Sequence, residues 1–290
     1  MRIGITGSHG FIGTHLLNKI SNNDEYIIKT FEGNIKNILD IENFIQNLDV
    51  IVHLAGKNRG LDIEILETNT IGTFNLLKTI TDKNPKAKLI FISSFHVYKQ
   101  WDNFKDIDET ILPQPVTIYG LSKKFAEELC FKFSTDNKIN IIILRLSNVY
   151  GPGSKPYYNS VISTFINRAI LKQPIIINGD GESVRDYIYI SDVIEAIINS
   201  IQKIHKEQFN IYNICSGTLN SLNDIIQIIK KYFPNEIIIE YNKLSKKEKP
   251  FNKGNNKKAI ASKIIGPNLV TLEKGLELMI KEEKNKLLKI

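Results

Sequence analysis

The sequence of 290 residues contains only two cysteines, Cys130 and Cys215. They fall in segments that we predict to be a helix and a buried strand. With so few thiols, a disulfide framework and a metal site built from cysteines are both disfavoured. We therefore expect no structural disulfide and no bound metal.

Long apolar segments are also missing. No run of about 18 apolar residues occurs, and the N-terminus has no charged stretch followed by an apolar region and a cleavage site. We therefore expect a cytoplasmic protein without a membrane span. Internal repeats and low-complexity linkers are absent as well, and a hydrophobic content of 42% suits one large or two modest domains.

Negative charge is in deficit, because 38 lysines and arginines face 31 aspartates and glutamates, for a net charge of +7. Such a charge suits nucleic acid, a membrane surface or an anionic small molecule. The densest lysine runs, at residues 243–258 and 281–289, lack the interleaved aromatic side chains that stack on bases. We interpret them as solvated faces and expect no binding of nucleic acid.

Three glycines dominate the N-terminal segment RIGITGSHGFIGTHLL. An apolar run at residues 3–5 is followed by Gly7, Gly10 and Gly13, after which the apolar positions follow a helical period. Glycine permits a tight turn, a close approach to phosphate and close packing of the helix on the strand. The N-terminus of that helix would then point at a pyrophosphate. We predict a dinucleotide site here, although a glycine-rich turn without a ligand has the same pattern.

Segments of strand length alternate with segments of helical period. The predicted strands are residues 3–5, 26–31, 49–54, 88–93, 140–146, 173–178, 210–214 and 236–241. The helices predicted after the first one are residues 41–47, 66–81, 124–134, 158–171, 192–204, 222–233 and 272–284. The alternation predicts an α/β fold, a doubly wound parallel sheet of the Rossmann type with a smaller interleaved C-terminal lobe. We expect residues 1–150 to bind the nucleotide with a return segment near 183–216, and residues 151–290 to form mainly the smaller, substrate-binding lobe.

Two short segments carry reactive side chains. Tyr119 and Lys123 are four residues apart, so on a helix they share one face, and a nearby ammonium lowers the pKa of a phenol. Ser93 and Ser94 end a predicted strand, where ligands gather in this architecture. Taken singly, the tyrosine and lysine fit an ordinary helix surface, and the serines fit strand-ending hydrogen bonds. Together they predict acid/base chemistry beside a nucleotide.

Seven motifs in order extend this picture. They are TGSHGFIG at 6–13, HLAG at 53–56, NTIGTFNLL at 69–77, SSFHVY at 93–98, YGLSK at 119–123, RLSNVYGPG at 145–153 and GDGESVRDYIYISD at 179–192. With them the chain resembles an extended short-chain dehydrogenase/reductase of the nucleotide-sugar epimerase/dehydratase family. Their joint occurrence is far more specific than any one motif.

The resemblance implies roles for individual residues. Tyr119 would be the catalytic acid/base, Lys123 would hold the nicotinamide ribose and Ser94 would bind the reacting sugar oxygen, while Asn69 would brace the loops. Gly7, Gly10, Phe11, Ile12 and Gly13 would surround the pyrophosphate, Asn34 and Ile35 would lie beside the adenine, and Leu54, Ala55 and Gly56 would border the cofactor. Asn148 and Arg185 would contact the sugar diphosphate, for which a guanidinium is well suited. An ion pair of Arg185 with Asp186 or Asp192 is the alternative.

Three positions depart from the family pattern. Glu32 follows the second predicted strand almost directly and is a candidate partner of the ribose 2′-hydroxyl, so NAD is favoured while NADP stays open. Asn178 stands where many relatives present an aromatic residue to the base. His96 occupies the position of a glutamate in dehydratases and of a cysteine in ketosugar epimerase-reductases. It is a candidate acid/base, substrate-binding or pocket-shaping residue.

The resemblance favours an NAD-dependent nucleotide-sugar epimerase that acts through a transient 4-keto sugar, most simply at C4. A reductase of a nucleotide-linked 4-keto-deoxysugar that consumes NAD(P)H is the second hypothesis, because HLAGKNRG at 53–60 and KPYYNSV at 155–161 resemble some reductases of the group. A cofactor-sensing or nucleic-acid-binding protein on the same fold is the third. The family also implies a homodimer that pairs through a helix bundle including the helix after Tyr119.

Overall fold

The computed structural model describes residues 1–99, 106–158, 160–206, 208–234, 237–243 and 253–287. Residue 236 of the predicted strand at 236–241, residue 159 of the predicted helix at 158–171 and of the KPYYNSV segment, and parts of the two lysine runs lie outside the described residues.

The main sheet has six parallel strands in the order β10-β6-β4-β3-β1-β2. Their bounds are β1 Arg2–Thr6, β2 Ile27–Thr30, β3 Val50–His53, β4 Lys88–Ser94, β6 Ile141–Leu146 and β10 Phe209–Ile214. Central strands are apolar on both faces, since Ile51 and Leu89 contribute to one buried cluster while Val52 and Ile90 contribute to the other. Burial on both faces is what a parallel sheet covered by helices requires.

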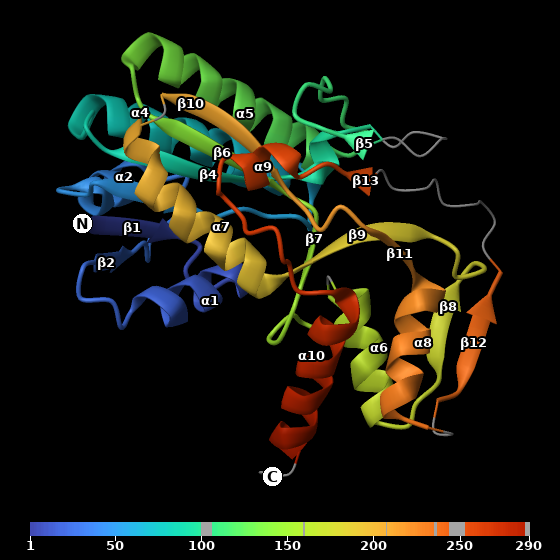
Figure 1. Cartoon of the computed structure of the whole chain (residues 1–290). Helices are drawn as coiled ribbons and strands as arrows, with labels where there is room; N and C mark the ends of the chain where they lie inside the picture. The colour runs from blue at the N-terminus through green and yellow to red at the C-terminus, as the bar shows by residue number, and fades with distance from the viewer. Residues whose placement is uncertain (100–105, 159, 207, 235–236, 244–252, 288–290) are drawn as a thin grey trace.

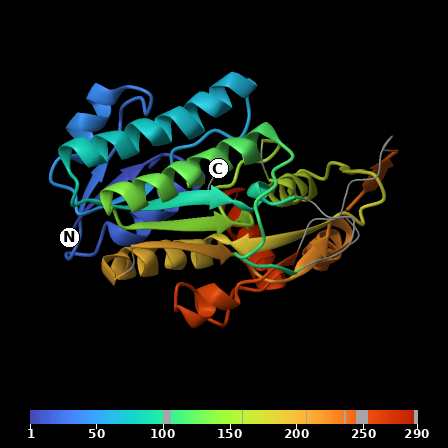
Figure 2. The ribbon, with the colours of Figure 1, turned by 90° about the horizontal axis from the view of Figure 1, so that it is seen from above.

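Helices cover the two faces of this sheet (Figures 1 and 2). On one side pack α2 (Ile38–Ile45), α4 (Gly72–Lys83) and α5 (Ile118–Asn137), and on the other α1 (Phe11–Ile20) and α7 (Ile190–Lys203). The α3 helix (Asp62–Leu66) continues into a π-helical turn, η1 (Glu67–Ile71), before α4. The predicted doubly wound Rossmann-type fold is confirmed.

A smaller lobe extends from one end of the sheet (Figure 1). It contains α6 (Val161–Ile170), α8 (Leu222–Tyr232), α10 (Leu272–Leu287) and the parallel pair β8 (Ile175–Asn178) and β12 (Ile239–Asn242). A three-stranded sheet joins it to the main sheet in the order β11-β9-β7, with bounds β7 Asn148–Tyr150, β9 Val184–Tyr189 and β11 Leu219–Ser221. Because β7 begins two residues after β6 ends, the chain passes from one sheet into the other at Ser147.

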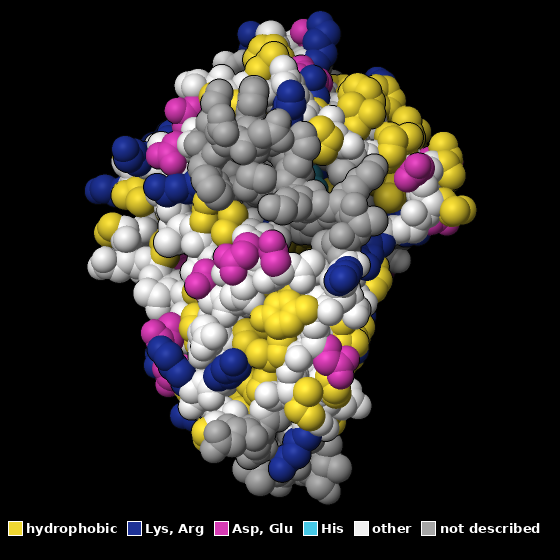
Figure 3. Space-filling view, turned by 90° about the vertical axis from the view of Figure 1, so that its right-hand side faces the viewer, with side chains coloured by type: hydrophobic (Ala, Val, Ile, Leu, Met, Phe, Trp, Pro, Cys, Tyr) yellow, Lys and Arg dark blue, Asp and Glu magenta, His cyan; other side chains and the backbone are white. Residues whose placement is uncertain are grey.

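Short elements complete the described chain. They are the parallel pair β5 (Asp106–Ile107) and β13 (Lys253–Gly254), the helix α9 (Lys257–Ala261), and the 3₁₀ turns η2 (Phe95–Val97) and η3 (Ile204–Lys206). Figure 3 shows hydrophobic side chains in small groups among charged ones on the face that includes the lobe. Within the ranges described, no helix combines the length and the apolar character needed to cross a membrane.

Three local features differ from the sequence predictions. The helix predicted from residue 124 begins at Ile118, because the Thr117 side chain caps it by accepting a hydrogen bond from the Gly120 amide at 3.0 Å. The helix predicted over 66–81 is interrupted by the η1 turn. The three-stranded sheet was not predicted, since two of its strands have only three residues each.

Candidate functional site

Two cavities meet beyond the C-terminal ends of the main-sheet strands, where ligands bind in this architecture. The first, of about 570 Å³, is lined by the loop after β1, the end of β4 and the start of α5, and we call it the glycine-loop cavity. The second, of about 540 Å³, lies between β9, α6 and α8, and we call it the lobe cavity. Asn148, Val149, Tyr158 and Ser160 line both. One elongated ligand can therefore reach from one cavity into the other.

The glycine loop has the geometry of a phosphate cradle. Gly7 has a φ of +70°, and the Gly10 amide donates to the Gly7 carbonyl at 3.1 Å. A Cβ at Gly13 would collide with the carbonyl oxygens of Gly7 and Ser8, so only glycine allows α1 to lie so close to β1. No side chain caps the N-terminus of α1, which leaves its first amides available to an anion. The loop thus fits the pyrophosphate of a dinucleotide.

Tyr119, Lys123 and Ser94 line the same cavity as this loop. Tyr119 and Lys123 lie on the first two turns of α5, and Ser94 is the last residue of β4. A Cβ at Gly120 would collide with the carbonyl oxygen of His96, so glycine brings the start of α5 against the turn after Ser94. The Lys123 Nζ donates to the Ile92 carbonyl at 2.8 Å, which fixes the ammonium beside β4.

Burial has the largest effect on the pKa values of Tyr119 and Lys123. It raises the pKa of Tyr119 above its usual value, and a side-chain hydrogen bond with Ser94 partly opposes the rise. Burial also lowers the pKa of Lys123 to about 8, against the opposing effect of Glu127. The spacing alone had predicted a lowered pKa for Tyr119. The rise corrects that expectation, because removal of the phenol from water disfavours its charged form more than the surrounding groups favour it.

His96 lies beside Tyr119 at the wall of the glycine-loop cavity. The two ring centroids are 5.4 Å apart, with an edge-to-face angle of 69°. Burial lowers the pKa of His96, and the positive charge of Arg185 lowers it further. The imidazole is therefore neutral at pH 7, which is the form that accepts a proton.

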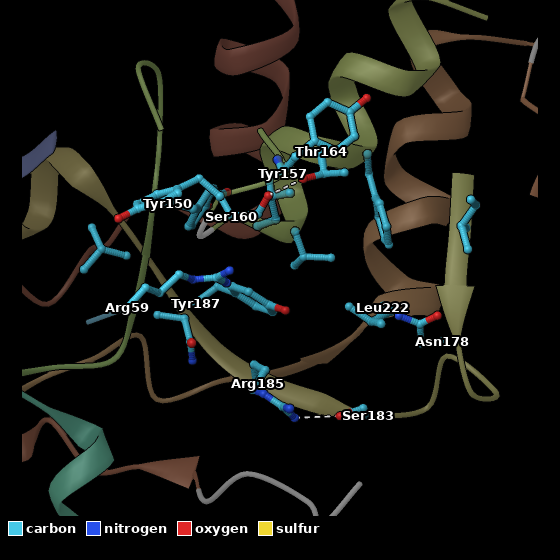
Figure 4. Close-up of a pocket in the computed structure, with 17 residues that line it drawn as sticks. Arg59, Tyr150, Tyr157, Ser160, Thr164, Asn178, Ser183, Arg185, Tyr187 and Leu222 are labelled. Carbon is cyan, nitrogen blue, oxygen red and sulfur yellow. Dashed lines mark hydrogen bonds between the residues drawn. The ribbon is translucent and has the colours of Figure 1, made fainter. Parts of the chain in front are cut away.

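Asn148 and Arg185 line the lobe cavity, and Figure 4 shows the Arg185 side chain beside Ser183. The Asn148 Nδ2 donates to the Asp186 carbonyl at 3.0 Å, and the Arg185 Nη1 donates to the Ser183 Oγ at 2.6 Å. Asp186 and Asp192 were the alternative ion-pair partners of Arg185. The Asp186 carboxylate accepts hydrogen bonds from Ser147, Ser216 and Gly217. The Asp192 carboxylate accepts a hydrogen bond from the Val270 amide. Both are thus engaged by other groups.

The predicted cofactor residues divide into two sets. Those that line the glycine-loop cavity are Gly7, Gly10, Phe11, Ile12, Gly13, Leu54, Gly56, Tyr119 and Lys123. Those outside its lining are Glu32, Asn34, Ile35 and Ala55. The Asn34 amide donates to the Asp40 carboxylate in α2, Ile35 is buried against Gly72, and the Ala55 amide donates to the Thr6 Oγ1. The exposed Glu32 carboxylate lies 3.8 Å from the His9 ring. Their contacts with a cofactor stay predictions.

Asn69 braces the loop after β3, as predicted. Its Oδ1 accepts from the Lys57 amide at 2.7 Å, and its Nδ2 donates to the Lys57 carbonyl at 2.8 Å and to the Ser122 Oγ at 2.9 Å. The loop is thereby fixed to α5 near Tyr119 and Lys123.

Several lining residues were not singled out from the sequence, among them Arg59, Lys155, Tyr158 and Ser160. They fall within HLAGKNRG and KPYYNSV, which drew notice only as a resemblance to reductases. Nothing in either segment says which side chains face a cavity. In the described part of the chain, no group of three or more histidine, cysteine, aspartate or glutamate side chains is placed to hold a metal ion.

Comparison with known proteins agrees with this geometry. A putative UDP-glucose 4-epimerase of Methanocaldococcus jannaschii is 32% identical over 253 residues, which cover 78% of this chain and 80% of that protein. Among solved structures, the UDP-glucose 4-epimerase of Thermotoga maritima with UDP-glucose is 26% identical with a TM-score of 0.88. The UDP-glucuronic acid 4-epimerase of Bacillus cereus, in complex with UDP-glucuronic acid and NAD, is 27% identical with a TM-score of 0.86. Each alignment covers 99% of this chain and 100% of the other.

A model of the NAD dependent epimerase/dehydratase family matches residues 3–215. The matched residues include the glycine loop, Ser94, Tyr119, Lys123, Asn148 and Arg185. The resemblance drawn from the motifs is thus confirmed, and the chain belongs to the NAD dependent epimerase/dehydratase family.

Proposed function

We propose that the protein is an NAD-dependent nucleotide-sugar epimerase that acts through a transient 4-keto sugar, at C4 in the simplest case. The observation that carries the proposal is that Ser94, Tyr119 and Lys123 line one cavity together with the glycine loop. A dinucleotide held by that loop would share a confined space with a hydroxyl, a phenol and an ammonium. These groups can bind a sugar hydroxyl and move its proton while a nicotinamide exchanges a hydride with the sugar carbon.

Bound NAD would supply the hydride acceptor, and in its reduced form the hydride donor, for the sugar carbon. Tyr119 would take the proton of the reacting sugar hydroxyl on its phenolic oxygen and give it back in the last step. Ser94, which shares a side-chain hydrogen bond with Tyr119, would orient the same sugar oxygen. Lys123 would hold the ribose, and its positive charge would favour the phenolate of Tyr119.

The lobe cavity suits the remainder of a nucleotide diphosphate sugar. Arg185 and Asn148 would hold the diphosphate, with the sugar beside Tyr119 and the base toward α6 and α8. In this arrangement residues 1–150 and the return segment near 183–216 would mainly carry the cofactor, with Asn148 and Arg185 as exceptions that contact the substrate, and residues 151–290 would mainly carry the substrate. Glu32 would face the adenosine ribose, which favours NAD over NADP.

We also propose that two copies associate through α4 and α5. Three phenylalanines on these helices are partly exposed, Phe74 by 40%, Phe125 by 46% and Phe131 by 53%. Exposed phenylalanines on these two helices supply apolar area that an interface between protein chains would bury. Sedimentation of the purified protein tests the homodimer.

A cytoplasmic location accords with the scarcity of cysteine.

The test is product analysis by mass and NMR when the protein meets a panel of UDP-, GDP- and dTDP-sugars, including 4-keto sugars, while the absorbance of NADH and NADPH is followed. An isomer of unchanged mass without net cofactor use supports the epimerase. A product two hydrogens heavier, with stoichiometric cofactor oxidation, would replace it with the 4-keto-deoxysugar reductase, which the segments at 53–60 and 155–161 favour. Cofactor binding without any turnover would favour a sensor on the same fold.

A further inference from the structure

Two cations flank the place where the cavities meet. Arg59 lines the lobe cavity, Lys155 lines the glycine-loop cavity, and Tyr158 lines both. The Arg59 guanidinium carbon lies 5.6 Å from the centroid of the Tyr158 ring. In Figure 4 the Arg59 side chain extends into the cavity between Tyr150 and Arg185. Both cations thus belong to the junction between the cavities.

Hydrogen bonds fix the two loops that carry these cations. Two residues before Arg59, both backbone polar groups of Lys57 bond with the Asn69 side chain. On the other loop, the His15 ring bonds with the Pro152 carbonyl at 2.8 Å, and the Ser154 Oγ donates to the Gly151 carbonyl at 2.7 Å. The cations are therefore presented by anchored backbone, which lowers the entropic cost of binding a ligand.

The junction has positive charge without a compensating carboxylate. Within the ranges described, neither cavity is lined by an aspartate or a glutamate. Lys57, in the same loop as Arg59, pairs with Glu64 at 2.6 Å, whereas no carboxylate of the described residues lies within 4.0 Å of the Arg59 or Lys155 nitrogens. Both side chains are exposed, so an anion of a ligand can reach them.

The position of the junction identifies that part of the ligand. If the proposed function holds, the sugar lies between Ser94 and Tyr119 in one cavity and Asn148 and Arg185 in the other, which places it at the junction. A neutral hexose would leave both exposed cations to water, whereas a carboxylate on the sugar would accept bonds from a guanidinium in a fork geometry. We propose that Arg59 and Lys155 form a subsite for a sugar carboxylate, and that the substrate is a nucleotide-linked uronic acid.

Binding by calorimetry to the NAD-loaded protein tests this proposal without any need for turnover. The probes are two matched pairs, UDP-glucose with UDP-glucuronic acid and GDP-mannose with GDP-mannuronic acid. In at least one pair the uronic acid should bind about tenfold or more tightly than the neutral sugar, as expected for a bond between charged groups. Equal binding within every pair, tighter binding of the neutral sugars, or binding of no probe would overturn the proposal.

Variants of the two cations test whether these side chains bind the sugar carboxylate or the diphosphate. Arg59→Gln and Lys155→Met should each lower the affinity for the uronic acid by about tenfold. The affinity for the neutral sugar of the same pair should change by less than about threefold. An equal loss for both partners would assign the cations to the diphosphate and overturn the proposal. Lys57→Met is the matched control, because its ammonium lies in the same loop but lines neither cavity. Uronic acid binding without epimerisation would reject the epimerase and leave this subsite standing.

Discussion

Arg145 and Glu127 form a buried ion pair directly behind the reactive end of β4. The Arg145 Nε donates to the Glu127 Oε1 at 3.0 Å and the Nη2 to the Oε2 at 2.6 Å, with side-chain exposures of only 3% and 6%. The Ser93 hydroxyl donates to the same carboxylate, and the Arg145 Nη1 donates to the Tyr98 oxygen at 2.7 Å. The pair therefore connects α5, β6 and the strand that ends in Ser94.

The substitution Glu127→Gln should lower the free energy of unfolding by about 3 kcal/mol, because it leaves the Arg145 charge buried without a counter-ion. Urea unfolding of the two proteins measures the difference. Glu128→Gln serves as the control, since its side chain is exposed on the next position of α5. A loss below about 1 kcal/mol would mean that the pair is not needed to compensate a buried charge.

The substitution Tyr119→Phe should reduce epimerisation by about 10²- to 10⁴-fold, the usual contribution of a positioned acid/base. Affinity for NAD should stay near that of the wild type, because the ring remains and the glycine loop is untouched. Initial rates and a fluorescence titration with NAD measure the two effects. Tyr26→Phe is the control, since this residue precedes β2 at the opposite end of the sheet. Retention of more than about a tenth of the activity would remove Tyr119 from the role of acid/base.

Part of the site could be predicted because it depends on short-range pattern. The spacing of Tyr119 and Lys123 on a helix, the end of a strand at Ser94 and the glycines before α1 are each local in sequence, and the structure brings them to one cavity. The fold followed from the same local alternation. The start of α5 was within reach too, because Thr117 precedes it as a capping residue, although it was missed.

Other features depend on contacts that no local pattern contains. Arg59 faces the junction because Asn69 anchors its loop, and Lys155 does so on a loop tied to His15, more than 130 residues earlier in the chain. The pKa of Tyr119 was predicted in the wrong direction for a related reason. Spacing identified the neighbouring lysine, but the degree of burial, which dominates, comes from the packing of the whole site.

The substitution His96→Gln should reduce C4 epimerisation by no more than about tenfold, well below the usual loss of an acid/base. The reason is that the lowered pKa of His96 makes its ring a weaker base, and the ring packs edge-to-face with Tyr119 at the wall of the pocket. The pH dependence of kcat/KM from pH 6 to 8 should keep its shape. A loss above about hundredfold together with a missing limb of that profile would instead assign proton transfer to His96.

His53 makes a separate contribution to acid sensitivity. Its ring is fully buried at the end of β3, bonded to the Thr6 Oγ1 at 2.7 Å and to the Thr73 Oγ1 at 3.0 Å. Burial, helped by the charge of Lys123, lowers its pKa from 6.5 to about 3. The unfolded chain therefore binds more protons than the native protein between pH 6.5 and pH 3, and stability from this group falls as the pH falls through that window.

Between pH 7 and pH 5, this one group should lower the free energy of unfolding by about 2 kcal/mol. Asp192, whose pKa burial raises to about 6, acts in the opposite direction, so wild type alone does not isolate the effect. The measurement is urea unfolding at both pH values for the wild type and for His53→Gln. The variant should have a lower free energy of unfolding than the wild type at pH 7. Its free energy of unfolding should fall less between pH 7 and pH 5, because glutamine does not titrate. His9→Gln, at an exposed histidine, should follow the wild type. If His53→Gln and the wild type lost the same free energy between the two pH values, the acid sensitivity would have to come from other groups.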